Sequence, residues 1–203
     1  MGQFQDAEAA YRDAVKMCEK LITGSPNVSD YQALLALILS NLGKLAEQQR
    51  EFAQARQLLQ KALLHHEAVL KANSQHTAYQ EQYRDNLSAL TQTCAGQHDQ
   101  AAAVEAATKL RDLGWNPPGD AYNAACALAQ CIAIVEIDEK ANKEERAKQI
   151  QFYGDRAMAM LRDAVAKGYK DAAHMKKNTE LDSLRSREDF KKLVADLEAA
   201  AKL

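Results

Sequence analysis

Apolar residues recur along the chain at intervals of three or four, which is the spacing of one face of an α-helix. In the first 22 residues these positions are Phe4, Ala7, Tyr11, Ala14, Cys18 and Ile22. A second stretch repeats the spacing with Phe52, Ala55, Leu59 and Ala62. The pattern predicts a helix in each stretch, with a small alanine beside a large residue so that neighbouring helices can approach closely.

Residues that commonly end helices divide the chain into hairpins. These breaks are Gly24 to Pro26, Asn73 to Gln75, Gly96, the Gly114 to Gly119 segment and Gly168. Elsewhere helix breakers are scarce, since the chain holds 3 Pro and 8 Gly in 203 residues. The sequence therefore predicts an all-α protein with no strand.

The hairpins carry an internal repeat. Gly2-Gln-Phe4 precedes Ala7, Arg50-Glu-Phe52 precedes Ala55, and Gly96-Gln-His98 precedes Ala101. The three alanines lie 48 and then 46 residues apart. A fixed period of this size is typical of stacked helical repeats.

Charge and cysteine usage restrict the class of partner. The 26 basic and 28 acidic residues are interspersed, so no basic surface is expected for nucleic acid. The longest apolar stretch, 121–137, contains Asn123, Gln130 and Glu136, which argues against a membrane span. The N-terminus also lacks a basic segment followed by an apolar one. We expect a cytoplasmic protein whose four cysteines are reduced core residues, and neither a membrane nor a nucleic-acid partner.

Asn41-Leu42-Gly43 and the Ala7, Tyr11, Ala14 triad resemble the tetratricopeptide repeat. The resemblance implies a right-handed α-α superhelix, a solenoid of helical hairpins, over residues 1–170. Residues 171–203 are expected to form a C-terminal helical cap of the same domain, because a solenoid needs a terminal unit with one polar face. The commonest repeat of the family has about 34 residues, so longer helices would fill the longer period here.

A narrower resemblance covers the second half of the chain. It rests on four segments: Ala121-Tyr-Asn-Ala-Ala-Cys126-Ala-Leu-Ala, Gly154-Asp-Arg-Ala157, Ala164-Val-Ala-Lys-Gly168-Tyr and Leu181-Asp-Ser-Leu-Arg-Ser-Arg-Glu-Asp-Phe190. It is similar to the C-terminal tetratricopeptide tails of large bacterial eukaryotic-like serine/threonine protein kinases. This resemblance implies a docking or regulatory tail without catalytic residues of its own.

Kinase chemistry is absent from the chain itself. A catalytic loop needs an Asn five residues after its Asp, but Cys18 follows Asp13 and Leu90 follows Asp85 at that spacing. No Gly-rich phosphate loop is present, and the five histidines have no partner at metal-ligand spacing. We predict no enzyme activity, no cofactor and no metal in this chain.

Three of the expected helices, those that follow the breaks at Gly24 to Pro26, Asn73 to Gln75 and Gly114 to Gly119, have polar positions where a ligand could bind. In a stack of hairpins the first helices line one surface, and asparagine side chains there can both donate to and accept from a peptide backbone. The alternative reading is a solvated helix face, since every amphipathic helix has a polar side. The candidate peptide-binding residues are Ser40, Asn41, Lys44, Gln82, Asp85, Asn86, Tyr122 and Asn123.

These features predict a non-catalytic module that binds a protein or peptide segment. The alternative is a self-association scaffold that brings attached kinase domains together. The Gly2-Gln-Phe4 motif matches the middle of a repeat, so we expect helix 1 to lack a first helix and the chain to be a piece of a longer protein. Helix 1 would then either fray or pair with a second copy to give a homo-dimer.

Overall fold

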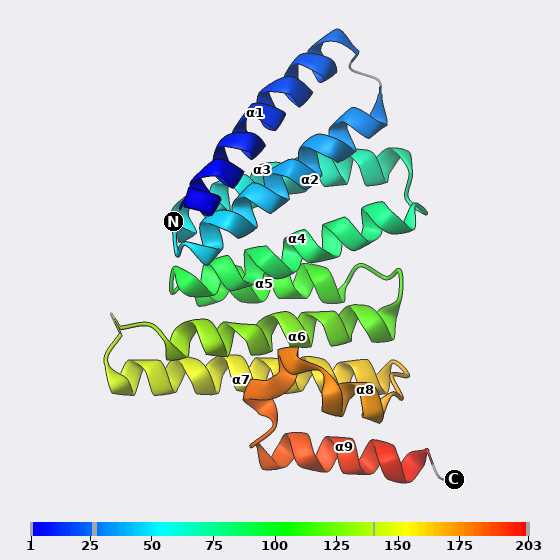
Figure 1. Ribbon diagram of the computed structural model, residues 1–203. Helices are drawn as coiled ribbons and strands as arrows, with labels where there is room; N and C mark the ends of the chain where they lie inside the picture. The colour runs from blue at the N-terminus through cyan, green and yellow to red at the C-terminus, as the bar shows by residue number, and fades with distance from the viewer. Residues whose placement is uncertain (1, 26–27, 140, 202–203) are drawn as a thin grey trace. The chain divides into compact units, whose positions relative to one another are not determined.

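The computed structural model describes residues 2–25, 28–139 and 141–201, and 84% of these residues are helical with no strand among them (Figure 1). The predicted all-α fold class, a tetratricopeptide-like series of helical hairpins, is confirmed. Pro26, which we expected to help end the first helix, lies outside the described residues. Within the described part of the chain, every helix is too short or too polar to cross a membrane.

The chain forms two compact units, residues 1–97 and 98–203, and each is described by itself. The first unit contains α1 (Gly2–Gly24), α2 (Ser29–Gln48), α3 (Phe52–Ala72) and α4 (Thr77–Gly96). Each helix packs against the next one along the chain, and α2 also contacts α4. The second helix therefore has neighbours on three sides.

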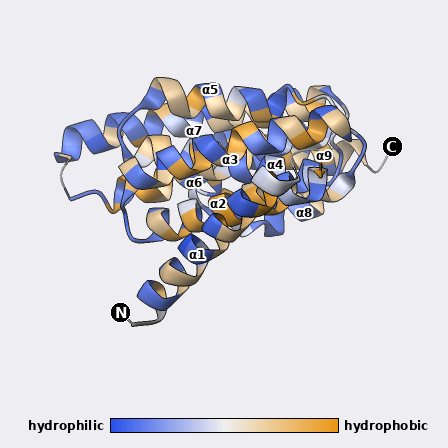
Figure 2. Ribbon diagram, turned by 90° about the horizontal axis from the view of Figure 1, so that it is seen from above, coloured by the Kyte–Doolittle hydropathy of each residue, from blue (hydrophilic) through white to orange (hydrophobic). Residues whose placement is uncertain are grey.

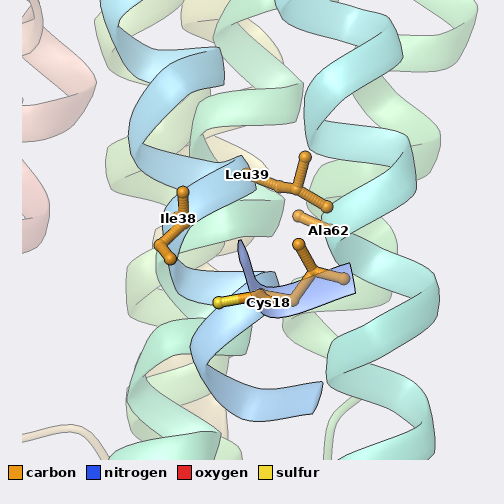
Figure 3. Close-up of a cluster of buried hydrophobic side chains, with 5 residues drawn as sticks. Cys18, Ile38, Leu39 and Ala62 are labelled. Atoms are coloured by element: carbon orange, nitrogen blue, oxygen red, sulfur yellow. The ribbon is translucent and has the colours of Figure 1, made fainter. Parts of the chain in front are cut away.

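Small residues set the distance between α2 and α3. A Cβ atom added to Gly43 would lie 2.8 Å from Cγ of Leu59, so only glycine lets the two backbones come this close. Ala55, Leu59 and Ala62 are fully buried on α3, as the apolar spacing predicted. Figure 3 shows Cys18, Ile38, Leu39 and Ala62 meeting in the core cluster of this unit.

Helix α1 is covered on one side. Tyr11, Ala14 and Ile22 pack partly buried against the core cluster, and Cys18 is buried in it. Phe4, Met17 and Leu21 remain exposed, with 65% of Met17 accessible to solvent. Figure 2 shows the N-terminal part of α1 extending away from α2 and α3. The uncovered apolar area that we expected on helix 1 is thus present.

The second unit is built around α6. Its elements are α5 (Gln100–Arg111), α6 (Pro117–Glu136), α7 (Lys143–Ala166), α8 (Ala172–Lys177), the 3₁₀ helix η1 (Thr179–Leu184) and α9 (Glu188–Ala200). α6 packs against α5, α7 and η1, while α9 contacts α7 and α8. The predicted boundary at residue 170 falls within this unit, and the capping role of 171–203 stays a prediction.

The structure corrects the register of the repeat. Arg50 and His98 both adopt the left-handed conformation, with φ of 60° and 61°, in the turn before a helix. This conformation is uncommon for residues other than glycine, so the two turns are equivalent points of the repeat. The equivalent of Ala55 is therefore Ala103, which is also fully buried, and not Ala101, which is exposed. Both offsets are 48 residues, and the predicted offset of 46 was wrong.

All four cysteines are buried free thiols, as expected for reduced core residues. Cys131 donates to the carbonyl oxygen of Ala127, one turn earlier in α6. Burial raises the pKa of Cys18 and of Cys126. These thiols consequently stay protonated at neutral pH and act as small core residues.

Candidate functional site

Helices α2 and α4 lie side by side and present a mixed polar and apolar surface. Tyr79 donates to Asp30 across the two helices at 2.9 Å, and Lys44 pairs with Asp85 at 3.5 Å further along. The positions between these contacts on α2 follow one helical stripe. We call this surface the α2/α4 face: Asp30, Leu34, Leu37, Asn41 and Lys44 of α2, with Tyr79, Gln82 and Asp85 of α4.

The α2/α4 face contains four of the predicted binding residues, Asn41, Lys44, Gln82 and Asp85, all exposed or half-buried. It also contains Leu34, an apolar residue that was not among the predicted binding residues. The side chain of Leu34 is 44% exposed. A surface leucine beside an asparagine offers both an apolar contact and hydrogen bonds to a ligand backbone.

Two other predicted residues lie beneath this face. Ser40 donates to Oδ1 of Asn86 at 3.0 Å, and Nδ2 of Asn86 donates to the carbonyl oxygen of Leu59 at 3.0 Å. Both side chains are buried. Ser40 and Asn86 thus connect α2, α3 and α4 from within, and their hydrogen-bonding groups are directed at the protein rather than at a ligand.

His66 completes this buried network, with Nε2 3.2 Å from Oγ of Ser40. Since the Ser40 proton is directed at Asn86, the serine oxygen accepts from Nε2–H of His66. Burial, aided by the charges of His65 and Lys44, lowers the pKa of His66 to about 4, so the ring is neutral at pH 7. A serine nucleophile needs the opposite arrangement, in which the hydroxyl donates to an exposed histidine, and the trio does not support such chemistry.

The α2/α4 face contains one basic residue, Lys44, and two acidic residues, Asp30 and Asp85. Lys44 faces Asp85 in an exposed pair, an arrangement that contributes about 0–1 kcal/mol to stability. Glu47 lies one turn from Lys44, and its burial raises its pKa to about 7, against the opposing effect of Lys44. With the lysine paired, the face lacks the cluster of cations that would bind a peptide C-terminal carboxylate.

The two predicted residues of the second unit, Tyr122 and Asn123, differ in burial. Asn123 is exposed on α6. Tyr122 is buried, because its ring stacks on Tyr169 with centroids 4.4 Å apart and its hydroxyl accepts from Nδ2 of Asn178 at 3.0 Å. The chain's own C-terminal segment therefore covers Tyr122. Asn178 was not among the predicted residues, although an Asn directly before Thr-Glu is a common helix-capping arrangement.

Residues 35–76 match the family model described as tetratricopeptide repeat. The matched range starts in α2, contains all of α3 and ends just before α4, so it corresponds to the α2/α3 hairpin. No curated protein and no solved structure that was compared with the chain matches it. The match supports the predicted tetratricopeptide resemblance, and repeats of this kind generally mediate protein–protein interaction and are typically non-catalytic.

Proposed function

We propose that the chain is a non-catalytic protein–protein interaction module whose α2/α4 face binds a peptide or protein segment. The carrying observation is that α2, the first helix of the hairpin with the tetratricopeptide match, also contributes one side of the half-open α2/α4 face. Leu34 and Leu37 would contact apolar side chains of the ligand, while Asn41 and Gln82 would bond to its backbone. Ser40, His66 and Asn86 support this face from below, and Tyr122 and Asn123 would belong to a second surface on α6.

A comparison of matched variants tests the role of the α2/α4 face. Asn41→Ala/Lys44→Ala/Gln82→Ala removes three of its polar side chains without touching a buried residue. The control Gln57→Ala/Gln60→Ala/Lys61→Ala removes three exposed polar side chains of α3. Affinity purification should recover the same partners with the wild type and the control, and lose them with the face variant. Equal recovery by all three proteins would remove the α2/α4 face from the proposal.

We further propose that this module is the cytoplasmic docking or regulatory tail of a bacterial serine/threonine kinase. The support is the resemblance of 121–129, 154–157, 164–169 and 181–190 to such tails. The complete open reading frame tests it directly. A kinase domain upstream of Met1 is the expected result, and a reading frame without one would contradict it.

Self-association through helix 1 is a second candidate function, in which a homo-dimer brings attached kinase domains together. It is favoured by the exposure of Phe4, Met17 and Leu21 on α1. Exposed apolar area on one helix can be covered by the same helix of a second copy across a two-fold axis. Sedimentation equilibrium should show a dimer that Met17→Glu/Leu21→Glu dissociates. A wild-type monomer at every concentration would exclude this candidate.

A further inference from the structure

One face of α6 is covered by a short segment from much later in the chain. Four α6 residues define this surface, which we call the α6 face: Tyr122, Cys126, Ala129 and Gln130. They follow one another at helical spacing. The element that lies on them is η1, together with Asn178 just before it (Figure 1, orange).

The contacts between the two elements are specific polar pairs. Nδ2 of Asn178 lies 3.0 Å from the Tyr122 hydroxyl and 3.5 Å from Sγ of Cys126. Gln130 donates to Glu180 at 2.8 Å, and Ser183 donates to the backbone carbonyl of Ala129 at 2.9 Å. The carbonyl oxygen of Ala129, which is part of the hydrogen-bonded backbone of α6, thus accepts a second hydrogen bond from Ser183 of the covering segment.

Two leucines of the covering segment are buried in the second unit. Leu181 and Leu184 are both fully buried, and they stand three residues apart, which places them on one side of a 3₁₀ helix. The covering segment therefore presents a compact pattern, Asn178-Thr-Glu180-Leu181-Asp-Ser183-Leu184. Five of its seven side chains contact α6 or are buried.

The segment is fastened just after its C-terminal end. There Arg187 pairs with Asp155 of α7 at 2.6 Å and with Asp189 at 2.9 Å. Arg187 lies directly over Gly154, where an added Cβ would be 2.5 Å from Nη1 of the arginine. We call Arg187, Asp155 and Gly154 the latch.

The covering segment has the properties of a bound peptide rather than of a repeat helix. It is a six-residue 3₁₀ helix, a form that is used in short pieces and has weaker hydrogen bonds than an α-helix. The latch consists of partly exposed ion pairs, which are weak in water. The two leucines, however, are fully buried, and exposing them to water is unfavourable unless another apolar group takes their place.

We propose that the α6 face is a binding surface for a partner polypeptide with the pattern Asn-x-Glu-Leu-x-Ser-Leu, and that residues 178–184 close it in cis. The proposal rests on the proposed function, that of a module which binds polypeptide segments. A partner with this pattern restores the polar pairs and both leucines, so the exchange replaces each contact with an equal one. The apparent affinity for the partner is lowered by the fraction of molecules in which the segment is closed.

The test is the binding of a fluorescent peptide with the sequence of residues 176–187 to the full chain, measured by anisotropy. Arg187→Ala opens the latch, and Gly154→Ala, which displaces Arg187 from above α7, is a second variant in case the first fails to fold. Lys148→Ala is the matched control, since it removes an exposed ion pair with Glu144 elsewhere on α7. A peptide with Asp in place of both leucines controls for sequence.

The latch variants should bind the peptide about tenfold or more tightly than the wild type and Lys148→Ala, and the Asp-containing peptide should not bind. Equal binding by the latch variants and the wild type would overturn the proposal. A latch variant that dimerises without binding peptide would also overturn it, in favour of exchange of the segment between two copies. Because Asn41, Lys44 and Gln82 lie in the other unit, Asn41→Ala/Lys44→Ala/Gln82→Ala should leave peptide binding unchanged. This variant therefore distinguishes a wrong assignment of the α2/α4 face from a wrong assignment of the α6 face.

Discussion

Helices α2 and α6 have the same length of 20 residues, and each opens a hairpin with the helix that follows it, but their outward faces differ. On α2 the stripe from Leu34 to Lys44 is open to solvent in part. On α6 the stripe from Tyr122 to Gln130 lies under η1. The comparison teaches that the first helix of a hairpin is a surface that another segment can occupy, and that one such surface in this chain is already occupied.

The amino-acid pattern of the two helices reflects the difference. α6 is apolar on nearly all sides and leaves few residues exposed, notably Asn123, Ala133 and Glu136. A helix that is apolar all round is one that is covered all round. α2 carries Leu34, Leu37, Asn41 and Lys44 on its open stripe, as expected for a helix side that stays partly exposed to solvent.

The largest expected effect separates the covered face from the open one. Leu184→Ala should lower the free energy of unfolding of the second unit by about 2–5 kcal/mol, because the side chain is fully buried. Leu34→Ala should cost less than about 1 kcal/mol, since that leucine is 44% exposed. Urea unfolding measures both, with the fluorescence of Trp115 reporting on the second unit. Equal costs would show that the two faces are covered alike.

Acid should weaken the buried network beneath α2. His66 has an ordinary pKa near 6.5 when unfolded and about 4 when folded, so only the unfolded chain takes up a proton between these values. The stability of the first unit should therefore fall by roughly 2–3 kcal/mol as the pH falls from 6.5 to 4.

Glu47 titrates in the opposite sense, because its folded pKa is raised to about 7 and its stabilising effect is lost as the pH rises. We therefore compare the unfolding free energies of two variants, Glu47→Gln alone and Glu47→Gln/His66→Gln. The difference in unfolding free energy between these two proteins should change over pH 4–6.5. A constant difference would contradict the assigned role of His66.

A smaller effect is expected at Ala55 of α3, the helix that packs against both α2 and α4. Ala55→Leu should destabilise the first unit by about 1–3 kcal/mol, because α3 is packed on both sides and a larger side chain forces its neighbours apart. Ala7, its equivalent in α1, is only half-buried, so Ala7→Leu should cost clearly less. Thermal unfolding of the two variants compares them. A neutral Ala55→Leu would contradict the packing described for α3.

The smallest effect is expected at Met17, which is 65% exposed on α1. Met17→Gln should change the stability of the monomer by less than about 0.5 kcal/mol, because no neighbouring helix covers the side chain. Differential scanning calorimetry on a dilute sample measures it. A loss of more than 1 kcal/mol would mean that a partner surface, such as a second copy, already covers Met17 in solution.

The helices and the core stripe of α3 could be predicted from the sequence because both depend on local spacing. The site could be predicted only in part. Helical spacing and polarity place Ser40, Asn41 and Asn86 alike on a polar side of their helices. Ser40 and Asn86, however, form hydrogen bonds to buried groups that lie 26 to 46 residues away in the chain. The cover on Tyr122 comes from Asn178, 56 residues later, through a pairing that no local pattern encodes.

Site-specific photo-crosslinking tests most directly whether the α2/α4 face is the place where a polypeptide binds. A photoreactive amino acid is introduced at position 34, 41 or 82 on this face, and at position 57 or 60 on the exposed side of α3 as the control. After irradiation in the source cells, we expect adducts to a common polypeptide from positions 34, 41 and 82 and none from position 57 or 60. Adducts from all five positions alike, or from α3 alone, would contradict it.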